Sequence, residues 1–171
     1  MRMLAQRPIT HIVIHTSASY SGGRILDPSA KDIDRWHRAK GWRSIGYHYV
    51  VRRDGSIEVG RDVRLVGAHV AGFNRTTIGV CFTGHGDYAP FTMAQMRAGA
   101  KLVADLIGIN GLEAKFRANP MRVLGHAEVG KFRQALSKMI GSKIPDPNKS
   151  CPGKKVDMSL FRVAVLEAIG K

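Results

Sequence analysis

Short apolar runs rich in β-branched residues recur along the chain and predict buried strands. Three of them are bounded by polar or glycine-containing turns: residues 9–15, 77–83 and 121–125. Runs of this length and composition are typical of strands that are covered on both faces. Two further runs, residues 46–53 and 56–60, flank the dipeptide Asp54-Gly55. That dipeptide favours a tight hairpin turn, so these two runs are predicted to pair.

Helical periodicity separates the predicted strands. Three segments have apolar residues at helical spacing after a residue that commonly caps helices: residues 29–41, 92–107 and 157–169. Ser29 with Asp32, and Thr92 with Gln95, have the spacing of a capping box. Alternating strands and helices predict an α/β fold, a single domain whose central mixed β-sheet is flanked by helices. Functional residues are then expected at strand ends and in loops.

Chain length and charge narrow the class of protein. The 171 residues suit one domain over 1–171, without a linker or repeat. Lys and Arg number 27 against 13 Asp and Glu, for a formal net charge of +14, which favours a polyanionic partner or surface. The basic residues are dispersed and show no helix-turn-helix, zinc-finger or RNP pattern, so no specific nucleic acid is predicted. An anionic cell envelope and a basic surface with no single partner both remain open.

Two local features bear on the compartment of the protein. Residues 1–8 lack an apolar segment of signal-peptide length, and no later stretch has the length of a transmembrane helix. We therefore expect synthesis and retention in the cytoplasm. In a reducing compartment Cys81, which lies in an apolar run, is expected to act as a small buried hydrophobe. Cys151, in a turn beside Pro152, is left free to bind a metal.

Three residues form a candidate zinc site. His15 ends the first apolar run, His126 follows residues 121–125, and Cys151 lies in a polar turn. Two imidazoles and one thiolate are a known ligand set for catalytic Zn²⁺, and they leave the fourth tetrahedral position open to water or substrate. Each histidine taken alone is more often a structural residue. The wide spacing means that only the tertiary fold can bring the three ligands together.

Six motifs give the sequence a family resemblance. They occur in this order: residues 12–18 (IVIHTSA), 35–42 (RWHRAKGW), 46–55 (GYHYVVRRDG), 67–69 (GAH), 74–80 (Asn74 with IGV) and 149–152 (KSCP). Together they resemble the type 2 N-acetylmuramoyl-L-alanine amidases, the small phage lysozymes among them, over residues 9–165. The resemblance implies a zinc site in a surface groove. It also implies cleavage of the amide bond between N-acetylmuramic acid and L-alanine in peptidoglycan.

The resemblance extends to biology and to individual side chains. It implies a phage or prophage endolysin, expected as a monomer, held in the host cytoplasm until a pore-forming protein gives it access to the cell wall. Tyr47 and Lys149 match the catalytic residues that are not ligands, and His69 and Asn74 match substrate-binding positions. Without the resemblance, Tyr47 is an ordinary strand aromatic, Lys149 a solvated loop charge and Asn74 a turn residue. The general base is left open, and Glu128 is one candidate.

An insertion separates two of the predicted ligands. Twenty-four residues lie between His126 and Cys151, more than in the phage amidases that the chain resembles. Within residues 131–150, the sequence predicts a short helix with one apolar face and cations on the others. Such a helix either docks beside the groove or, through residues 131–143, binds anionic outer-membrane lipid.

Three other functions compete with the amidase. A non-catalytic peptidoglycan-binding protein of the same fold is the first, but such relatives lack the cysteine ligand, and Cys151 is present. Binding to a phage RNA polymerase, known for some phage amidases, depends on surface residues that the resemblance does not transfer. Nucleic-acid binding is favoured only by charge, and its affinity would fall steeply with salt.

Overall fold

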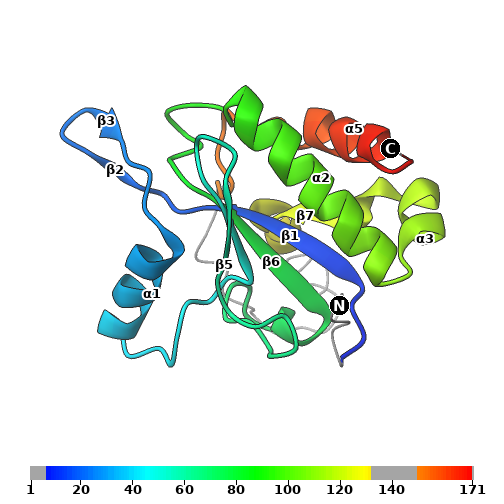
Figure 1. Cartoon of the computed structure of the whole chain (residues 1–171), viewed down its shortest axis with the longest axis horizontal. Helices are drawn as coiled ribbons and strands as arrows, with labels where there is room; N and C mark the ends of the chain where they lie inside the picture. The colour runs from blue at the N-terminus through cyan, green and yellow to red at the C-terminus, as the bar shows by residue number, and fades with distance from the viewer. Residues whose placement is uncertain (1–6, 132–149, 171) are drawn as a thin grey trace.

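A five-stranded mixed sheet forms the centre of the computed structural model, which describes residues 7–131 and 150–170 (Figure 1). The strand order is β5-β4-β6-β1-β7, and only β5 runs antiparallel to its neighbour. The strands of this sheet are β1 (His11–Thr16), β4 (Tyr49–Val51), β5 (Ile57–Val59), β6 (Thr77–Phe82) and β7 (Val123–Gly125). The predicted α/β class and mixed sheet are thus confirmed.

Helices cover the sheet unequally. They are α1 (Ala30–Ala39), α2 (Met93–Ile109), α3 (Glu113–Ala118) and α5 (Met158–Ala168). Figure 1 shows α2 and α5 side by side, with α1 well separated from them. The predicted capping boxes at Ser29 and Thr92 are confirmed, and Asp157 caps α5. Two short 3₁₀ helices occupy Asn74–Thr76 and Pro120–Arg122. None of the helices among the described residues is long and apolar enough to cross a membrane.

The two faces of the sheet have different tasks. Because side chains alternate along a strand, Ile12 and Ile14 of β1 point to one face and Val13 and His15 to the other. The first face packs on α2, α3 and α5 and forms the main apolar core. The second face is covered only in part, by α1 near β4 and by a small cluster around Val13. A site on that second face can stay open to solvent beside α1.

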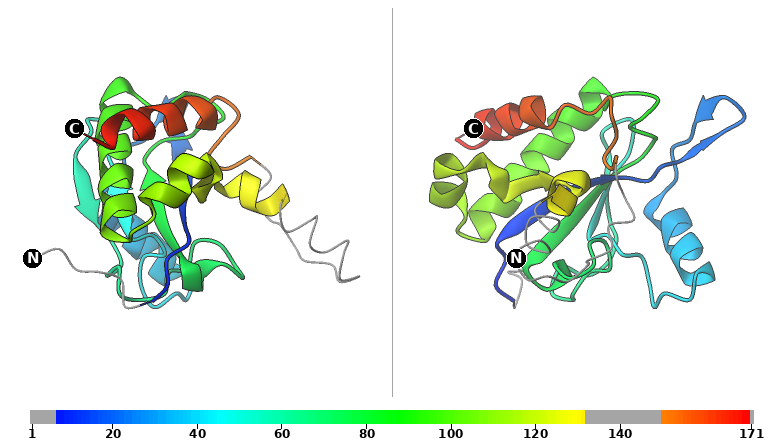
Figure 2. Two further views of the ribbon diagram at one scale, coloured as in Figure 1. Left: turned by 90° about the vertical axis from the view of Figure 1, so that its right-hand side faces the viewer. Right: turned by 180° about the vertical axis from the view of Figure 1, so that it is seen from behind.

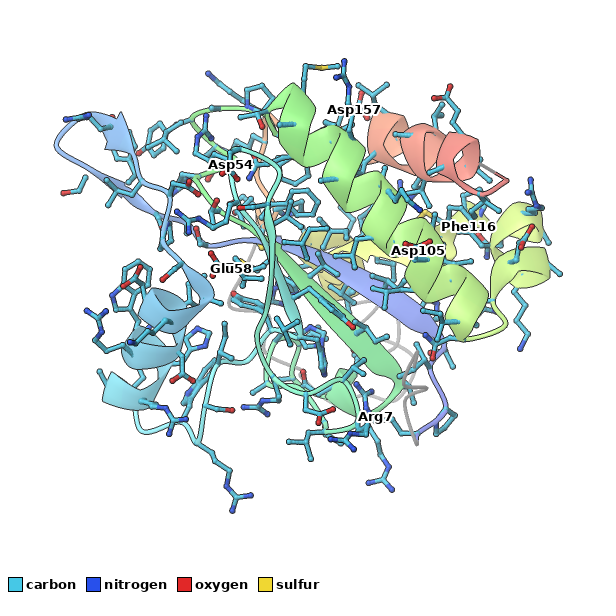
Figure 3. The ribbon with its side chains drawn as sticks, viewed as in Figure 1. Arg7, Asp54, Glu58, Asp105, Phe116 and Asp157 are labelled. Carbon is cyan, nitrogen blue, oxygen red and sulfur yellow. The ribbon has the colours of Figure 1, made fainter. Side chains whose placement is uncertain are left out.

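A charged network fixes α1 against the edge of the sheet. Glu58 of β5 points toward the first turn of α1 (Figure 3) and accepts a hydrogen bond from the backbone N–H of Ala30 at 2.6 Å. Arg52 pairs with Glu58 at 2.8 Å and with Asp27 at 3.0 Å. The helix N-terminus thereby gains a carboxylate partner for a backbone N–H that lacks one within the helix.

The predicted hairpin is correct in place, but its strands are shorter than expected. β4 begins at Tyr49. The preceding residue, His48, is bonded to β6 partly through its side chain instead of only through its backbone. The backbone N–H of His48 donates to the Gly79 carbonyl at 2.9 Å, and the Gly79 N–H donates to Nδ1 of the His48 ring at 3.0 Å. A side chain thus replaces one backbone acceptor of the ladder. A second hairpin, β2 (Tyr20–Ser21) with β3 (Arg24–Ile25), projects from the body of the molecule and was not predicted (Figure 2).

Candidate metal centre

Neighbouring parallel strands bring the two predicted histidine ligands together. Ile14 of β1 is paired with Gly125 of β7, so the residues that follow, His15 and His126, lie side by side at the same edge of the sheet. Their ring centroids are 4.8 Å apart. Parallel strands end at one edge, which is where open α/β sheets commonly place functional groups. His126 is also the first residue of a helical turn that covers residues 126–131.

A tightly docked turn delivers the cysteine. The backbone N–H of Ala127 donates to the Cys151 carbonyl at 2.6 Å, and the Thr16 hydroxyl donates to the Pro152 carbonyl at 2.9 Å. A Cβ on Gly86 would lie 1.8 Å from the Pro152 carbonyl oxygen. Only glycine permits that approach of two backbones. The turn therefore fixes Cys151 beside the end of β1, although 136 residues separate it from His15.

The donor atoms of His15, His126 and Cys151 are close enough to share one ion. One donor atom from each residue lies within 4.8 Å of the other two. The Cys151 Sγ and the His15 Nδ1 are 3.8 Å apart. Tetrahedral zinc, with bonds of about 2.0 to 2.3 Å, holds its N and S ligands about 3.5 Å apart. Both the spacing and the soft donor set therefore fit zinc, and they suit Mg²⁺ or Ca²⁺ poorly because those ions prefer oxygen.

Burial controls the protonation of these ligands. His15 is only 1% exposed and His126 7%. Burial, followed by the charges of His69 and His126, holds the pKa of His15 well below its ordinary value, so the neutral, ligating form prevails at pH 7. Burial raises the pKa of the Cys151 thiol to about 11. A cation that binds here must displace that proton, which couples metal binding to proton release.

A groove of about 380 Å³ opens beside Cys151. Tyr47 and Asp87 also line it, and α1 contributes Trp36 and His37. A larger hollow of about 740 Å³ lies between α2 and α5, but its lining is mostly apolar and includes none of the three predicted ligands. The chemistry therefore belongs to the smaller groove.

Tyr47 lines the groove beside His15. Its ring centroid lies 5.1 Å from that of His15 and 5.5 Å from that of His37. Burial raises the pKa of the Tyr47 phenol well above its ordinary value, so the hydroxyl keeps its proton and can donate a hydrogen bond. The preceding residue is held in place because the Gly46 N–H donates to Nδ1 of His37 at 2.9 Å.

The two predicted substrate-binding residues lie behind the metal ligands. Nδ1 of His69 is 3.0 Å from Nε2 of His15, and His69 is only 8% exposed. The Asn74 side-chain oxygen accepts the backbone N–H groups of His69 and Val70, both at 2.8 Å. Neither His69 nor Asn74 lines the groove. Their substrate contacts stay predictions, while the structure gives both residues partners on the buried side of His15.

Other predicted residues are only partly placed. Lys149 and residues 132–149 of the insertion, with most of the predicted lipid-binding segment 131–143, lie outside the described residues. Glu128 is described, and it accepts the Gly125 N–H at 2.7 Å and pairs with Arg162 of α5. It does not line the groove. Those partners give Glu128 a structural role at the start of the helical turn, and a role as general base stays a prediction.

Comparison with known proteins agrees with this geometry. A family model described as N-acetylmuramoyl-L-alanine amidase matches residues 5–154. The chain belongs to this family. The predicted family membership is thus confirmed, and the matched region includes every residue of the candidate site.

Individual members of the amidase family and its relatives are similar to parts of the chain. The endolysin of Klebsiella phage KP32 is 41% identical over 102 residues, which cover 57% of this chain and 66% of that endolysin. Peptidoglycan-recognition protein SC2 of Drosophila simulans is 27% identical over 121 residues, 70% of this chain and 63% of that protein. The chain thus spans slightly less than two thirds of the length of these relatives.

A solved structure supports the fold. The amidase LysC from Clostridium intestinale superposes with a TM-score of 0.72 at 21% identity, covering 97% of this chain and 91% of LysC. The amidase fold is therefore shared over nearly the whole chain, whatever the sequence divergence.

Several residues that build the site were missed from sequence. The hydrogen bond from Thr16 to the Cys151–Pro152 turn, and the contact of Gly86 with that turn, join segments far apart in the chain. The signal for Gly86 was its place three residues after the predicted strand 77–83, beside Asp87. His37 packs against Trp42 and lines the groove. Its bond to Gly46 had no sequence signal.

Proposed function

We propose that the chain is a zinc-dependent peptidoglycan amidase that cleaves the bond between N-acetylmuramic acid and L-alanine, acting as a phage or prophage endolysin. One observation carries the proposal: His15, His126 and Cys151 bring donor atoms within 4.8 Å of one another, and Cys151 lines a groove together with Tyr47. Zinc supplies Lewis acidity toward water and toward a carbonyl, which hydrolysis of an unactivated amide requires.

The side chains of the groove account for the remaining chemistry. The protonated Tyr47 hydroxyl donates a hydrogen bond to the amide oxygen as negative charge develops there. Lys149, two residues before Cys151 in the sequence, supplies a second donor, which is positively charged. Trp36 of α1 provides an apolar wall against which the sugar or peptide stem packs. The two hydrogen-bond donors strengthen binding of the transition state more than that of the planar amide, whereas Trp36 strengthens both alike.

The net charge of +14 fits an anionic wall as partner. Endolysins lyse the host from within, so the enzyme would remain in the host cytoplasm until it gains access to peptidoglycan. A monomer suffices, because all three ligands come from one chain.

Binding of outer-membrane lipid through residues 131–143 is a further part of this proposal, tested by neutralising Lys131, Arg133 and Lys138. Unchanged lysis of intact Gram-negative cells by that variant would remove the lipid contact.

A non-catalytic peptidoglycan-binding protein is the alternative, favoured by the similarity to a recognition protein. The two functions are separated by measuring release of soluble peptides with new L-alanine amino termini from purified Gram-negative peptidoglycan. The protein is assayed as isolated, after chelation, and after zinc is restored. We expect activity to be lost and regained. No release in any state, with zinc bound, would favour the binder.

A pair of cysteine variants makes the test specific to the site. Cys151→Ala removes a ligand and is expected to abolish both zinc binding and peptide release. Cys81→Ala removes the other free thiol, which is buried beside α1, and is expected to retain both. Equal activity of the two variants would contradict the proposed ligand set.

A further inference from the structure

We propose that His69 is a positioning residue, which selects the tautomer of neutral His15 and thereby leaves its Nδ1 free to bind the metal. The proposal rests on the metal site of the proposed function. It assigns His69 a partner within the protein, where the family resemblance predicted a contact with substrate. The argument follows a chain of hydrogen bonds from a backbone carbonyl to the ligand.

The series of hydrogen bonds begins at the carbonyl oxygen of Phe73, which can accept a hydrogen bond but cannot donate one. The Thr77 hydroxyl donates to the carbonyl oxygen of Phe73 at 2.8 Å. With its proton committed there, the same hydroxyl oxygen can still accept a bond, and Nε2 of His69 lies 3.3 Å away. Nε2 of His69 therefore carries the ring proton, and in the neutral imidazole Nδ1 is left as an acceptor.

The tautomer of His69 fixes the direction of its hydrogen bond with His15. Nδ1 of His69 lies 3.0 Å from Nε2 of His15, so Nε2 of His15 must be the donor of this bond. The other nitrogen of His15, Nδ1, then carries no proton. It is this nitrogen that lies 3.8 Å from the Cys151 Sγ. Metal-binding histidines commonly donate their second N–H to a fixed acceptor, which orients the ring and selects the tautomer.

The His69 ring is held rigidly enough for this role. A Cβ on Gly79 would lie 2.6 Å from its Cγ, and one on Gly67 would lie 2.6 Å from its Cδ2. Two glycines therefore leave space for the imidazole and nothing larger. Asn74 fixes the backbone, because its side-chain oxygen accepts the N–H of His69 at 2.8 Å. Both the ring and the main chain are constrained, as a positioning residue requires.

Zinc affinity is the first measurement. Competition with a chromophoric chelator compares the wild-type protein with His69→Leu, which removes the acceptor, and His69→Asn, whose side-chain oxygen replaces Nδ1. We expect about a tenfold to hundredfold weaker affinity for His69→Leu and restored affinity for His69→Asn. If His69→Leu binds zinc as tightly as the wild type but has a raised KM for peptidoglycan, His69 contacts substrate and the proposal is wrong.

A second pair of variants leaves the packing of His69 intact. Thr77→Val keeps the shape of the side chain but removes the hydroxyl, whereas Thr77→Ser keeps the hydroxyl. We expect weaker zinc binding for Thr77→Val than for Thr77→Ser, because only the first frees the tautomer of His69. Equal affinities in this pair would contradict the relay. The pair also decides the question if His69→Leu does not fold.

A metal-free measurement separates this inference from the proposed function. Nitrogen NMR of the chelated protein, labelled in histidine, reports which ring nitrogen carries the proton. We expect His15 protonated on Nε2 in the wild type and a mixture of tautomers in Thr77→Val. A wild-type His15 protonated on Nδ1 would overturn the relay. A wild type with the expected tautomer that binds no zinc would instead overturn the proposed function.

Discussion

At the scale of single residues, the candidate site combines two buried histidines with a half-buried cysteine and a half-buried tyrosine. His15 and Cys151 belong to the candidate metal centre, and the Tyr47 ring lies 5.1 Å from the His15 ring. Tyr47 and its neighbour His48 have opposite tasks, although they are adjacent in the sequence. The first lines the groove, and the second is fully buried against Gly79.

Replacing Tyr47 by Phe removes the hydroxyl without opening a cavity. Because the hydroxyl acts on charge that develops during the reaction, we expect kcat to fall by about 10²–10³ while zinc affinity stays unchanged. Tyr49→Phe is the matched control, since Tyr49 packs on the main core, and its kcat should equal that of the wild type. Peptide release measured at saturating peptidoglycan gives both values. A normal kcat for Tyr47→Phe would exclude a catalytic role for the hydroxyl.

Buried His48 predicts a loss of stability in acid. Burial, partly offset by its bond to the Leu65 carbonyl, lowers its pKa from 6.5 to about 4. Between these pH values the unfolded chain binds more protons than the folded protein, so stability decreases as the pH falls from about 6.5 toward 4. The loss is at most about 3 kcal/mol. Urea unfolding of the chelated protein should show a shallower pH dependence for His48→Gln; equal pH slopes would contradict this assignment.

At the scale of elements, α1 supplies one wall of the groove and depends on a charged link to the sheet. Arg52 joins Asp27, which precedes α1, to Glu58, whose other oxygen accepts the N–H of Ala30. Burial of these charges is partial, so the network stabilises more than an exposed ion pair does and less than a core contact. The position of α1 thus relies on polar bonds as well as on Ile33.

Arg52→Gln is expected to lower the free energy of unfolding by about 1–2 kcal/mol, because it leaves two carboxylates without their partner. Arg35→Gln removes an exposed ion pair with Asp32 on α1. We expect this variant to change the free energy of unfolding by less than about 0.5 kcal/mol. Urea denaturation of the two variants at pH 7 makes the comparison. Equal effects would mean that the link between α1 and the sheet contributes no more to the free energy of unfolding than an exposed ion pair does.

At the scale of the whole molecule, the candidate metal centre ties together distant parts of the chain. Its ligands come from β1, from the end of β7 and from the turn before α5. An ion that binds all three stabilises the folded state and has no preformed site in the unfolded chain. Metal binding should therefore be visible in the melting temperature.

Zinc at about a thousand times its dissociation constant should stabilise the fold by about 4 kcal/mol. For a domain of this size, that corresponds to a rise in Tm of about 8–16 °C over the chelated protein. Differential scanning calorimetry at several zinc concentrations measures the shift, and Cys151→Ala should show little of it. A Tm independent of zinc in the wild type would argue against a shared ligand set.

Most of the regular elements could be predicted from sequence because their signals are local. The capping boxes at Ser29 and Thr92 and the buried runs at β1 and β6 are written in residues a few positions apart. The β2–β3 hairpin was missed because it pairs only two residues on each strand, although Gly22 and Gly23, both with positive φ, are typical of a tight hairpin turn. The early start predicted for β4 failed at His48, whose side chain replaces a backbone bond.

By itself, the sequence determined the α/β class and the family and predicted the three candidate metal donors, because residue types and short-range periodicity encode them. Only the tertiary structure decided how these donors meet. His15 and Cys151 are 136 residues apart, and His69 reaches His15 across 54. Contacts at such separations depend on strand register, on the closeness of Gly86 to Pro152 and on the direction of each hydrogen bond. Those are properties of packed geometry, which no local pattern in the chain specifies.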